Sequence, residues 1–183
     1  YDFQTENPAT VVPRNHRYEV PERLDERGDV STPLDEAAAR DVAAQLVDAD
    51  ISSVAVSLLF SYENGSHERR IKEILEAEGV DASFSLSSEV LPEIREYERT
   101  LTTALNAALK PVMDRYLGNL ETEIAELGIR PKLEIMQSNG GIITADIART
   151  RPVNTLLSGP AAGVQGASYV AELAGIENLI TMD

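Results

Sequence analysis

Apolar residues follow two different spacings along the chain. Leu34, Ala38, Val42 and Leu46 are four residues apart, which places them on one face of a helix. Short β-branched runs, such as ISSVAVSLLF over 51–60, have the length and composition of buried strands. The pattern predicts helices over about 32–50, 66–79, 93–127, 144–150 and 159–175, and strands over about 16–20, 51–60, 80–87, 132–137, 153–158 and 178–183.

Capping and breaking residues predict where these helices begin and end. Thr32 is a candidate N-cap with Pro33 at the first helical position and Asp35 three residues after the cap. Ser66 is expected to cap the second helix, and a glycine at 79 ends it. Pro111 is expected to kink or break the long helical region because proline lacks a backbone N–H.

Strands that alternate with helices are typical of an α/β fold with a largely parallel sheet. The first thirty or so residues contain Pro8, Pro13, Pro21 and Gly28 among charged residues, and they predict a loop with one short strand near His16–Val20. The length of 183 residues suits one domain, or one and a part of another.

The composition is that of an ordinary globular protein, with 43% hydrophobic and 26% charged residues. No apolar run approaches the ~20 residues of a membrane span. There is no cysteine, which excludes disulfides, thiolate catalysis and cysteine-based zinc sites, and which fits a reducing compartment. We therefore expect a cytoplasmic protein without a membrane partner.

The charge is strongly negative. Asp and Glu number 31 against 16 Lys and Arg, a formal net charge of −15, and the lysines are Lys72, Lys110 and Lys132. An anionic surface repels phosphate backbones, so nucleic acid is not an expected partner. The acid excess has two interpretations, a solvated surface that aids solubility or an adaptation to a halophilic environment.

The stretch SGPAAGVQGA follows an apolar run and predicts a helix that starts with small residues. Ser158 or Gly159 is the expected cap, with Pro160 at the first helical position. Gly159, Gly163 and Gly166 share one face, which admits another backbone or a ligand at close range. Helix N-termini also favour phosphate. Close helix packing without a ligand remains the alternative.

Two further motifs each have a functional and a purely structural interpretation. SNGG, at Ser138–Gly141, predicts a tight turn that either connects two elements or presents Asn139, Gly140 and Gly141 to a ligand. REYER places Arg95 and Arg99 four residues apart, with Glu96 three residues before Arg99. The pattern fits either an intrahelical ion-pair ladder or a buried arginine that braces a cleft.

The two histidines carry little evidence of chemistry. His16 lies in the proline-rich segment and is expected to be solvated, and His67 lies in the first turn of a helix beside Glu68, which complements the helix dipole. No Ser/His/Asp set and no H-E-x-x-H motif is present. The residues alone therefore identify no catalytic group.

Taken together, SSEVLPEIREYERTLTTALNAALKPVMDRYL, EIMQSNGG, RPVNTLLSGPAAGVQGA and NLITMD resemble the A subunit of the hydantoinase/5-oxoprolinase family. The resemblance extends to PERLDERGDVSTPLD and SYENGSHE. It implies a ribonuclease H-like lobe of the actin/hexokinase/Hsp70 ATPase fold, with a largely parallel or mixed sheet and flanking helices. Residues 1–89 would end an N-terminal region, and residues 90–183 would start the main domain. It also implies that the chain is an internal fragment, which stops before a phosphate-binding Gly-Gly-Thr turn.

The resemblance implies a function and a set of sites. Family members use ATP and Mg²⁺ or another divalent metal to open cyclic amides, with a B subunit or B-type domain as partner. Acetone or acetophenone carboxylases and a non-catalytic ATP-gated module are the alternatives. Ser158, Gly159, Ala161, Gly163 and Asp183 would lie near the nucleotide phosphates, with Asp183 also near the metal; Asn139, Gly140, Gly141, Arg95 and Arg99 would lie near the substrate or cleft. The catalytic residues remain unknown, and the fragment alone is expected to be inactive.

Overall fold

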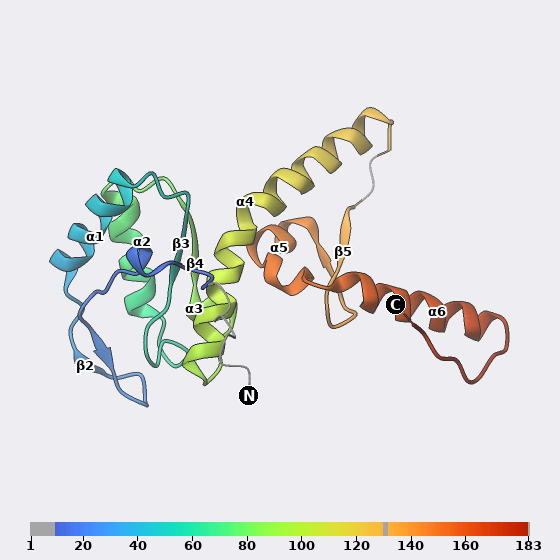
Figure 1. Cartoon of the computed structure of the whole chain (residues 1–183), viewed down its shortest axis with the longest axis horizontal. Coiled ribbons are helices and arrows are strands. Elements are labelled where there is room, and N and C mark those ends of the chain that lie inside the picture. The colour runs from blue at the N-terminus through green and yellow to red at the C-terminus, as the bar shows by residue number, and fades with distance from the viewer. Residues whose placement is uncertain (1–9, 130–131, 183) are drawn as a thin grey trace, which may run out of the picture. The chain divides into compact units, whose positions relative to one another are not determined.

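The computed structural model describes residues 10–129 and 132–182, and the chain divides into two compact units (Figure 1). The first unit is Tyr1–Ala108 and the second is Leu109–Asp183. Helix α4, Glu96–Glu126, begins in the first unit and ends in the second.

The first unit contains short strands between helices. Its elements are η1 (Arg14–His16), β1 (Arg23–Leu24), β2 (Val30–Thr32), α1 (Glu36–Asp48), β3 (Ser53–Val56), α2 (Ser66–Ala77), β4 (Ser83–Leu86) and α3 (Ser87–Val90), followed by the start of α4. β1 and β2 pair antiparallel, and β3 and β4 pair parallel in the register Ser53↔Ser83 to Val56↔Leu86. The strands predicted over 51–60 and 80–87 are thus confirmed.

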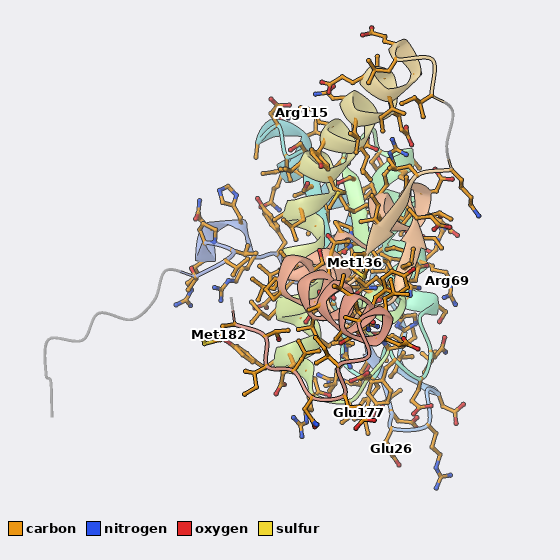
Figure 2. The ribbon with its side chains drawn as sticks, turned by 90° about the vertical axis from the view of Figure 1, so that its right-hand side faces the viewer. Glu26, Arg69, Arg115, Met136, Glu177 and Met182 are labelled. Atoms are coloured by element: carbon orange, nitrogen blue, oxygen red, sulfur yellow. The ribbon has the colours of Figure 1, made fainter. Side chains whose placement is uncertain are left out.

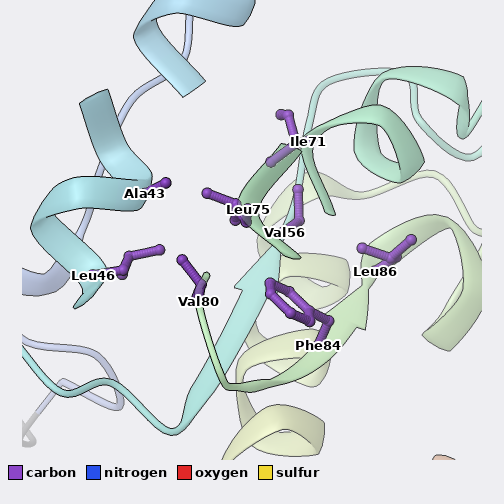
Figure 3. Packing of buried hydrophobic residues seen from close by; sticks show 8 residues of the cluster. All are labelled: Ala43, Leu46, Val56, Ile71, Leu75, Val80, Phe84 and Leu86. Carbon is purple, nitrogen blue, oxygen red and sulfur yellow. The ribbon is translucent and has the colours of Figure 1, made fainter. Parts of the chain in front are cut away.

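The core of this unit lies between β3, β4 and the helices α1 and α2 (Figure 3). α1 contributes Ala43 and Leu46, and α2 contributes Ile71 and Leu75. Val56, Val80, Phe84 and Leu86 complete the cluster from the strands and the segment before β4. All eight side chains are nearly inaccessible to solvent. The burial of their apolar surface is the main contribution of this core to stability.

The predicted N-caps of α1 and α2 are wrong, and one predicted strand is absent. Asp35, rather than Thr32, is the N-cap of α1, and its carboxylate accepts from the N–H groups of Ala37 and Ala38. Thr32 is instead the last residue of β2. Ser66 is the first helical residue of α2, and Asn64 accepts its N–H. His16–Val20 forms no strand; its first residue ends η1.

A glycine and a proline, the two residue types with unusual backbone properties, lie at the end of α2 and within α4. Gly79 has φ +88°, a left-handed conformation that glycine adopts without strain, and it ends α2 as predicted. Pro111 lies inside α4, which continues through it to Glu126, so the break is wrong, and the kink, the other expectation, stays a prediction. Proline removes one helical hydrogen bond, and the long helix on both sides tolerates this loss.

The second unit is built on the antiparallel pair of β5 (Glu134–Met136) and β6 (Ile142–Thr144). α5 (Ala145–Thr150), η2 (Pro152–Thr155) and α6 (Ser158–Leu173) follow. Leu117, Ala145 and Ala148 form its buried cluster, against which Met113, Leu133, Ile135 and Ile143 pack. The strand over 132–137, the turn and both helices are confirmed, whereas β6 was not predicted.

Two predicted strands are absent from the described part of this unit. VNTLLS over 153–158 begins as the 3₁₀ helix η2, and residues 178–182 form no strand. Ile180 and Met182 are 93% and 95% exposed, and the Met182 side chain extends away from the ribbon (Figure 2). An apolar run becomes a strand only when another strand pairs with it, and none among the described residues does so.

The fold is therefore mixed α/β with small sheets. Within residues 10–129 and 132–182 the strands form three two-stranded sheets, of which only β3–β4 is parallel. The expected largely parallel sheet is not formed by these residues. No helix in this part of the chain is long and apolar enough to cross a membrane.

Candidate functional site

In the second unit, the SNGG turn lies beside the segment that leads into α6. The backbone N–H of Ser138 donates to the carbonyl of Asn154 at 2.8 Å. The Ser138 hydroxyl donates to the carbonyls of Asn154 and Leu156. Two motifs that are remote in sequence, SNGG and SGPAAG, are thereby held close together.

The turn itself uses the residues that the sequence singled out. Gly140 has φ +84°, and the Asn139 side-chain oxygen accepts the N–H of Gly141 at 2.8 Å. This is the local turn that Asn favours. Because the Asn139 oxygen is engaged, a ligand would be met by its amide N–H₂ group. Asn139, Gly140 and Gly141 as substrate-proximal residues remain a prediction.

The start of α6 has an unusual backbone. Leu157 precedes the helix with φ +58°, and its side chain is 84% exposed. Leucine rarely adopts this left-handed conformation, and such strain concentrates at functional sites. No side chain caps the helix, and Pro160 is its third residue, so the expected cap and first position are wrong. The amides of Leu157, Ser158 and Gly159 precede the first intrahelical bond.

The glycine face of α6 is open among the described residues. A Cβ built at Gly159, Gly163 or Gly166 would meet nothing within 4 Å. A close backbone neighbour at Gly163, which the small-residue face predicted, is thus not supplied by this part of the chain. A ligand at Ser158, Gly159, Ala161 or Gly163 remains a prediction, and Asp183 lies outside the described residues.

One residue of α6 has a contact that the sequence did not indicate. The Gln165 amide nitrogen lies 3.1 Å from the position that a Cβ of Gly140 would take. Gln165 therefore borders the SNGG turn, so a substitution of Gln165 would also disturb that turn. The exposed Ser168 is a better position for a control substitution on α6.

In the first unit, Arg95 and Arg99 have separate environments. Arg95 precedes α4 with φ +82°, and its side chain is 78% exposed with Glu98 at 3.8 Å. Arg99 is 1% exposed and donates to the carbonyls of Leu58 at 2.7 Å and Glu93 at 3.0 Å. The ion-pair ladder is therefore wrong for Arg99, and the buried arginine is correct.

Arg99 also stacks on an aromatic ring. Its guanidinium carbon lies 5.2 Å from the centroid of Tyr62, which is within the range of a cation–π contact. The Arg99 Nε is buried and makes no hydrogen bond to any of the described residues. Arg99 thus joins the loop after β3 to the segment before α4, close to a cavity of about 740 Å³ that Tyr62, Glu93 and Arg95 help to line.

Glu68 is a buried carboxylate that the sequence analysis assigned only to the helix dipole. It is fully buried, and it accepts from the Leu58 N–H at 3.0 Å, the Ser87 hydroxyl at 2.6 Å and the Ser88 N–H at 2.8 Å. Glu68 and Arg99 therefore bind the N–H and the carbonyl of the same residue, Leu58. The helical spacing of α2 could have indicated this burial, because Glu68 lies three residues before Ile71.

The histidines do not form a metal site. The Nδ1 of His67 lies 2.7 Å from a Glu22 carboxylate oxygen, and His16 is exposed as expected. Among the described residues, no group of three or more His, Cys, Asp or Glu side chains could hold a metal ion.

Two surface ion pairs shift acid–base equilibria. A hydrogen bond from Arg149 lowers the pKa of the Glu121 carboxyl group. A hydrogen bond from Arg70 similarly lowers the pKa of Glu36. The pair of Arg70 and Glu36 is exposed, whereas in the other pair Arg149 is partly buried and Glu121 is exposed.

Family models match both parts of the chain. The model described as "Hydantoinase/oxoprolinase N-terminal region" matches residues 1–79, and the one described as "Hydantoinase/oxoprolinase" matches residues 99–183. The chain belongs to the hydantoinase/oxoprolinase family, which confirms the resemblance drawn from its motifs.

Individual relatives match all of the chain or a large part of it. The caprolactamase subunit alpha of Pseudomonas jessenii is 38% identical over 183 residues, which are 100% of this chain and 26% of that protein. The 5-oxoprolinase of Saccharomyces cerevisiae is 34% identical over 134 residues, 73% of this chain and 10% of that protein. The chain thus spans about a quarter of the first relative and a smaller share of the second.

Solved structures agree with these relationships. The crystal structure of the ATP-dependent caprolactamase from Pseudomonas jessenii matches with a TM-score of 0.90 and 38% identity, over 100% of this chain and 26% of that chain. A nucleotide-free structure of acetone carboxylase matches with a TM-score of 0.81 and 33% identity, over 93% of this chain and 24% of that chain.

Proposed function

We propose that this chain is part of an ATP-dependent enzyme that opens cyclic amides. The observation that carries the proposal is the similarity to the caprolactamase, which extends over all 183 residues in sequence and in fold. The name of the 5-oxoprolinase relative points to the same class of substrate. ATP and a divalent metal are the proposed cofactors.

The start of α6 is the proposed phosphate-proximal site. The N–H groups of Leu157, Ser158 and Gly159 receive no acceptor from a capping side chain and could donate to an anion, which the positive end of the helix dipole also favours. The open glycine face, with Gly163, leaves room for a close approach. Bound ATP would supply the phosphoryl group that activates a carbonyl oxygen. The donors at α6 would hold and orient the phosphates during this transfer.

The SNGG turn is the proposed substrate-proximal element of the same unit. Ser138 anchors it to the segment before α6, so Asn139, Gly140 and Gly141 lie close to the proposed phosphate site. Arg95, with its exposed guanidinium, is a candidate ligand for a carboxylate or phosphate. Arg99 has a positioning role instead, because its buried guanidinium contacts two backbone carbonyls and an aromatic ring.

The metal and the partner are proposed from the family. Asp183 is the proposed metal ligand, since carboxylate oxygens suit Mg²⁺. A B subunit or B-type domain is the proposed partner, supported by the relative's designation as subunit alpha. The cytoplasm remains the expected compartment.

A second function has its own support. The acetone carboxylase structure matches 93% of this chain, so carboxylation of a ketone follows as the alternative. A non-catalytic, ATP-gated module of the same fold is the third candidate function. It differs from the other two in that it would bind ATP without turning over a substrate.

The test is ATP turnover by the full-length polypeptide with its partner subunit. Release of ADP should depend on a cyclic amide, offered as caprolactam, 5-oxoproline or hydantoin. Turnover only with acetone or acetophenone plus bicarbonate would identify a carboxylase, and ATP binding without any turnover would identify the module. The 183-residue chain alone is expected to show no turnover above a buffer control.

A further inference from the structure

The cavity of about 740 Å³ beside Arg99 lies entirely within the first unit, and its volume is within the range of roughly 300–1,000 Å³ of small-molecule sites. The loop after β3 lines it with Tyr62 and Glu63. The segment before α4 lines it with Glu93 and Arg95, and the first turn of α4 adds Glu98. Charges of both signs and an aromatic ring therefore face one cavity.

The two segments that line this cavity are held by one buried side chain. The Nη1 of Arg99 donates to the Glu93 carbonyl at 3.0 Å, and the guanidinium carbon lies 5.2 Å from the centroid of the Tyr62 ring. Arg99 is only 1% exposed, so water does not compete for these contacts. Walls that are fixed before a ligand arrives reduce the conformational entropy that binding costs.

The arginines beside the cavity favour an anionic group. The buried Arg99 guanidinium has two carbonyls as acceptors, and its Nε has no acceptor among the described residues. The Arg99 N–H bonds to the Arg95 carbonyl at 3.0 Å, so the two arginines are one turn apart. Arg95 is 78% exposed, lines the cavity and has Glu98 at 3.8 Å. A carboxylate bound to the planar fork of Arg95 would also compensate the buried charge of Arg99.

Two carboxylates of the same cavity favour a cationic group. Glu63 and Glu93 are exposed, and neither forms an ion pair with any residue that the structure describes. Unpaired carboxylates that line a cavity attract an ammonium group. A ligand with only one sign of charge would leave either Arg95 or this pair of glutamates without a partner.

We propose that this cavity binds a zwitterionic amino acid, with its carboxylate at Arg95 and its ammonium at Glu63 and Glu93. The identity of the ligand rests on the proposed function. Opening a cyclic amide adds one water across the C–N bond of the ring, so that the carbonyl carbon ends as a carboxylate and the nitrogen as an ammonium. The product therefore carries both charges, whereas the amide group of the substrate carries neither. The cavity is a binding site for the ring-opened product.

The test is titration calorimetry on the full-length polypeptide with its partner subunit, without ATP, so that binding is measured apart from turnover. The probes are 6-aminohexanoate and glutamate, with hexanoate and hexylamine as analogues of single charge. One of the two zwitterions should bind, and hexanoate and hexylamine should each bind at least about tenfold more weakly than 6-aminohexanoate or glutamate, whichever binds. No saturable binding of either zwitterion, or equal binding of a singly charged analogue, would overturn the proposal.

Variants assign the binding to this cavity. Arg95→Gln should weaken binding at least about tenfold, and so should the double variant Glu63→Gln/Glu93→Gln. These side chains are exposed, so the variants should keep the parental unfolding midpoint. Arg70→Gln is the matched control, because Arg70 is an exposed arginine paired with Glu36 and does not line the cavity. Parental affinity in either cavity variant would overturn the proposal.

ATP turnover on the same preparations separates this inference from the proposed function. Turnover of a cyclic amide without binding of either zwitterion would overturn the product site and leave the proposed function standing. Zwitterion binding that depends on Arg95, without turnover of any cyclic amide, would overturn the proposed function and retain the cavity as an amino-acid site.

Discussion

Replacing Glu68 with glutamine should destabilise the first unit without changing its shape. The two side chains are nearly isosteric, but the glutamine amide nitrogen cannot accept a hydrogen bond. If the nitrogen takes the place of Oε2, it faces the Ser88 N–H; if it takes the place of Oε1, it faces the Leu58 N–H. In both orientations a backbone donor loses its acceptor.

The magnitude follows from burial and charge. Glu68 is fully buried, so water cannot replace the lost acceptor. Leaving a buried donor unsatisfied costs about 1–3 kcal/mol, and hydrogen bonds to charged groups contribute about 1.5–3 kcal/mol each. Since the remaining bonds survive in weaker form, we expect Glu68→Gln to lower the free energy of unfolding by about 2–4 kcal/mol.

The assay is urea unfolding, combined with hydrogen exchange at the Leu58 and Ser88 amides. The unfolding midpoint should fall with an unchanged slope, and both amides should exchange faster. Glu36→Gln is the matched control, because Glu36 bonds to Arg70 and Arg40 at the surface and should change stability by at most about 0.5 kcal/mol. Equal stability of Glu68→Gln and the parent, with unchanged exchange, would refute the role of Glu68 as a buried acceptor.

Three further predictions concern α6, pH and salt. Gly163→Ala should stabilise α6 by about 0.5–1 kcal/mol, because a Cβ there meets no described residue within 4 Å. If the proposed function holds, Gly163→Val in the full-length polypeptide should reduce ATP turnover, whereas Ser168→Ala should not. Parental turnover by Gly163→Val would remove the site assignment. Arg149 lowers the pKa of Glu121, so their pair stabilises the fold above the ordinary pKa of 4.5 and is lost as pH falls through the lowered value. The stability deficit of Glu121→Gln, measured by urea unfolding, should therefore shrink from pH 7 to below pH 4.5, and a constant deficit would contradict this cause. If the net charge of −15 reflects a halophilic source, the melting temperature should rise from low salt to molar KCl as repulsion is screened, and a flat or falling curve would exclude the idea.

Local signals in the sequence predicted individual elements well. The apolar run before Ser57 and the helical spacing of α1 and α2 depend on neighbours a few residues away, and these elements are present. The sheet depends on which strands meet, and no local pattern contains that information. VNTLLS shows the limit, because a strand-like composition became a 3₁₀ helix where no pairing strand was present among the described residues.

The candidate sites were predicted in the same uneven way. SNGG and the α6 start were found because glycine and proline have conformational consequences that sequence reveals. Arg99 could be placed on a helix, but whether it was paired on the surface or buried depended on Leu58, which lies 41 residues away. Glu68 was missed for the same reason, since its acceptor role requires the loop after β3 and the start of α3.

Leu58 is bonded at both of its backbone groups, by an anion at its N–H and by a cation at its carbonyl. These bonds orient the peptide planes on either side of its Cα, so together they fix the direction in which the chain leaves β3. Neither bond uses the leucine side chain. Another apolar residue of similar size at position 58 should therefore preserve the path of the loop. The direction of the chain after β3 is instead determined by Glu68 and Arg99, which are distant in sequence.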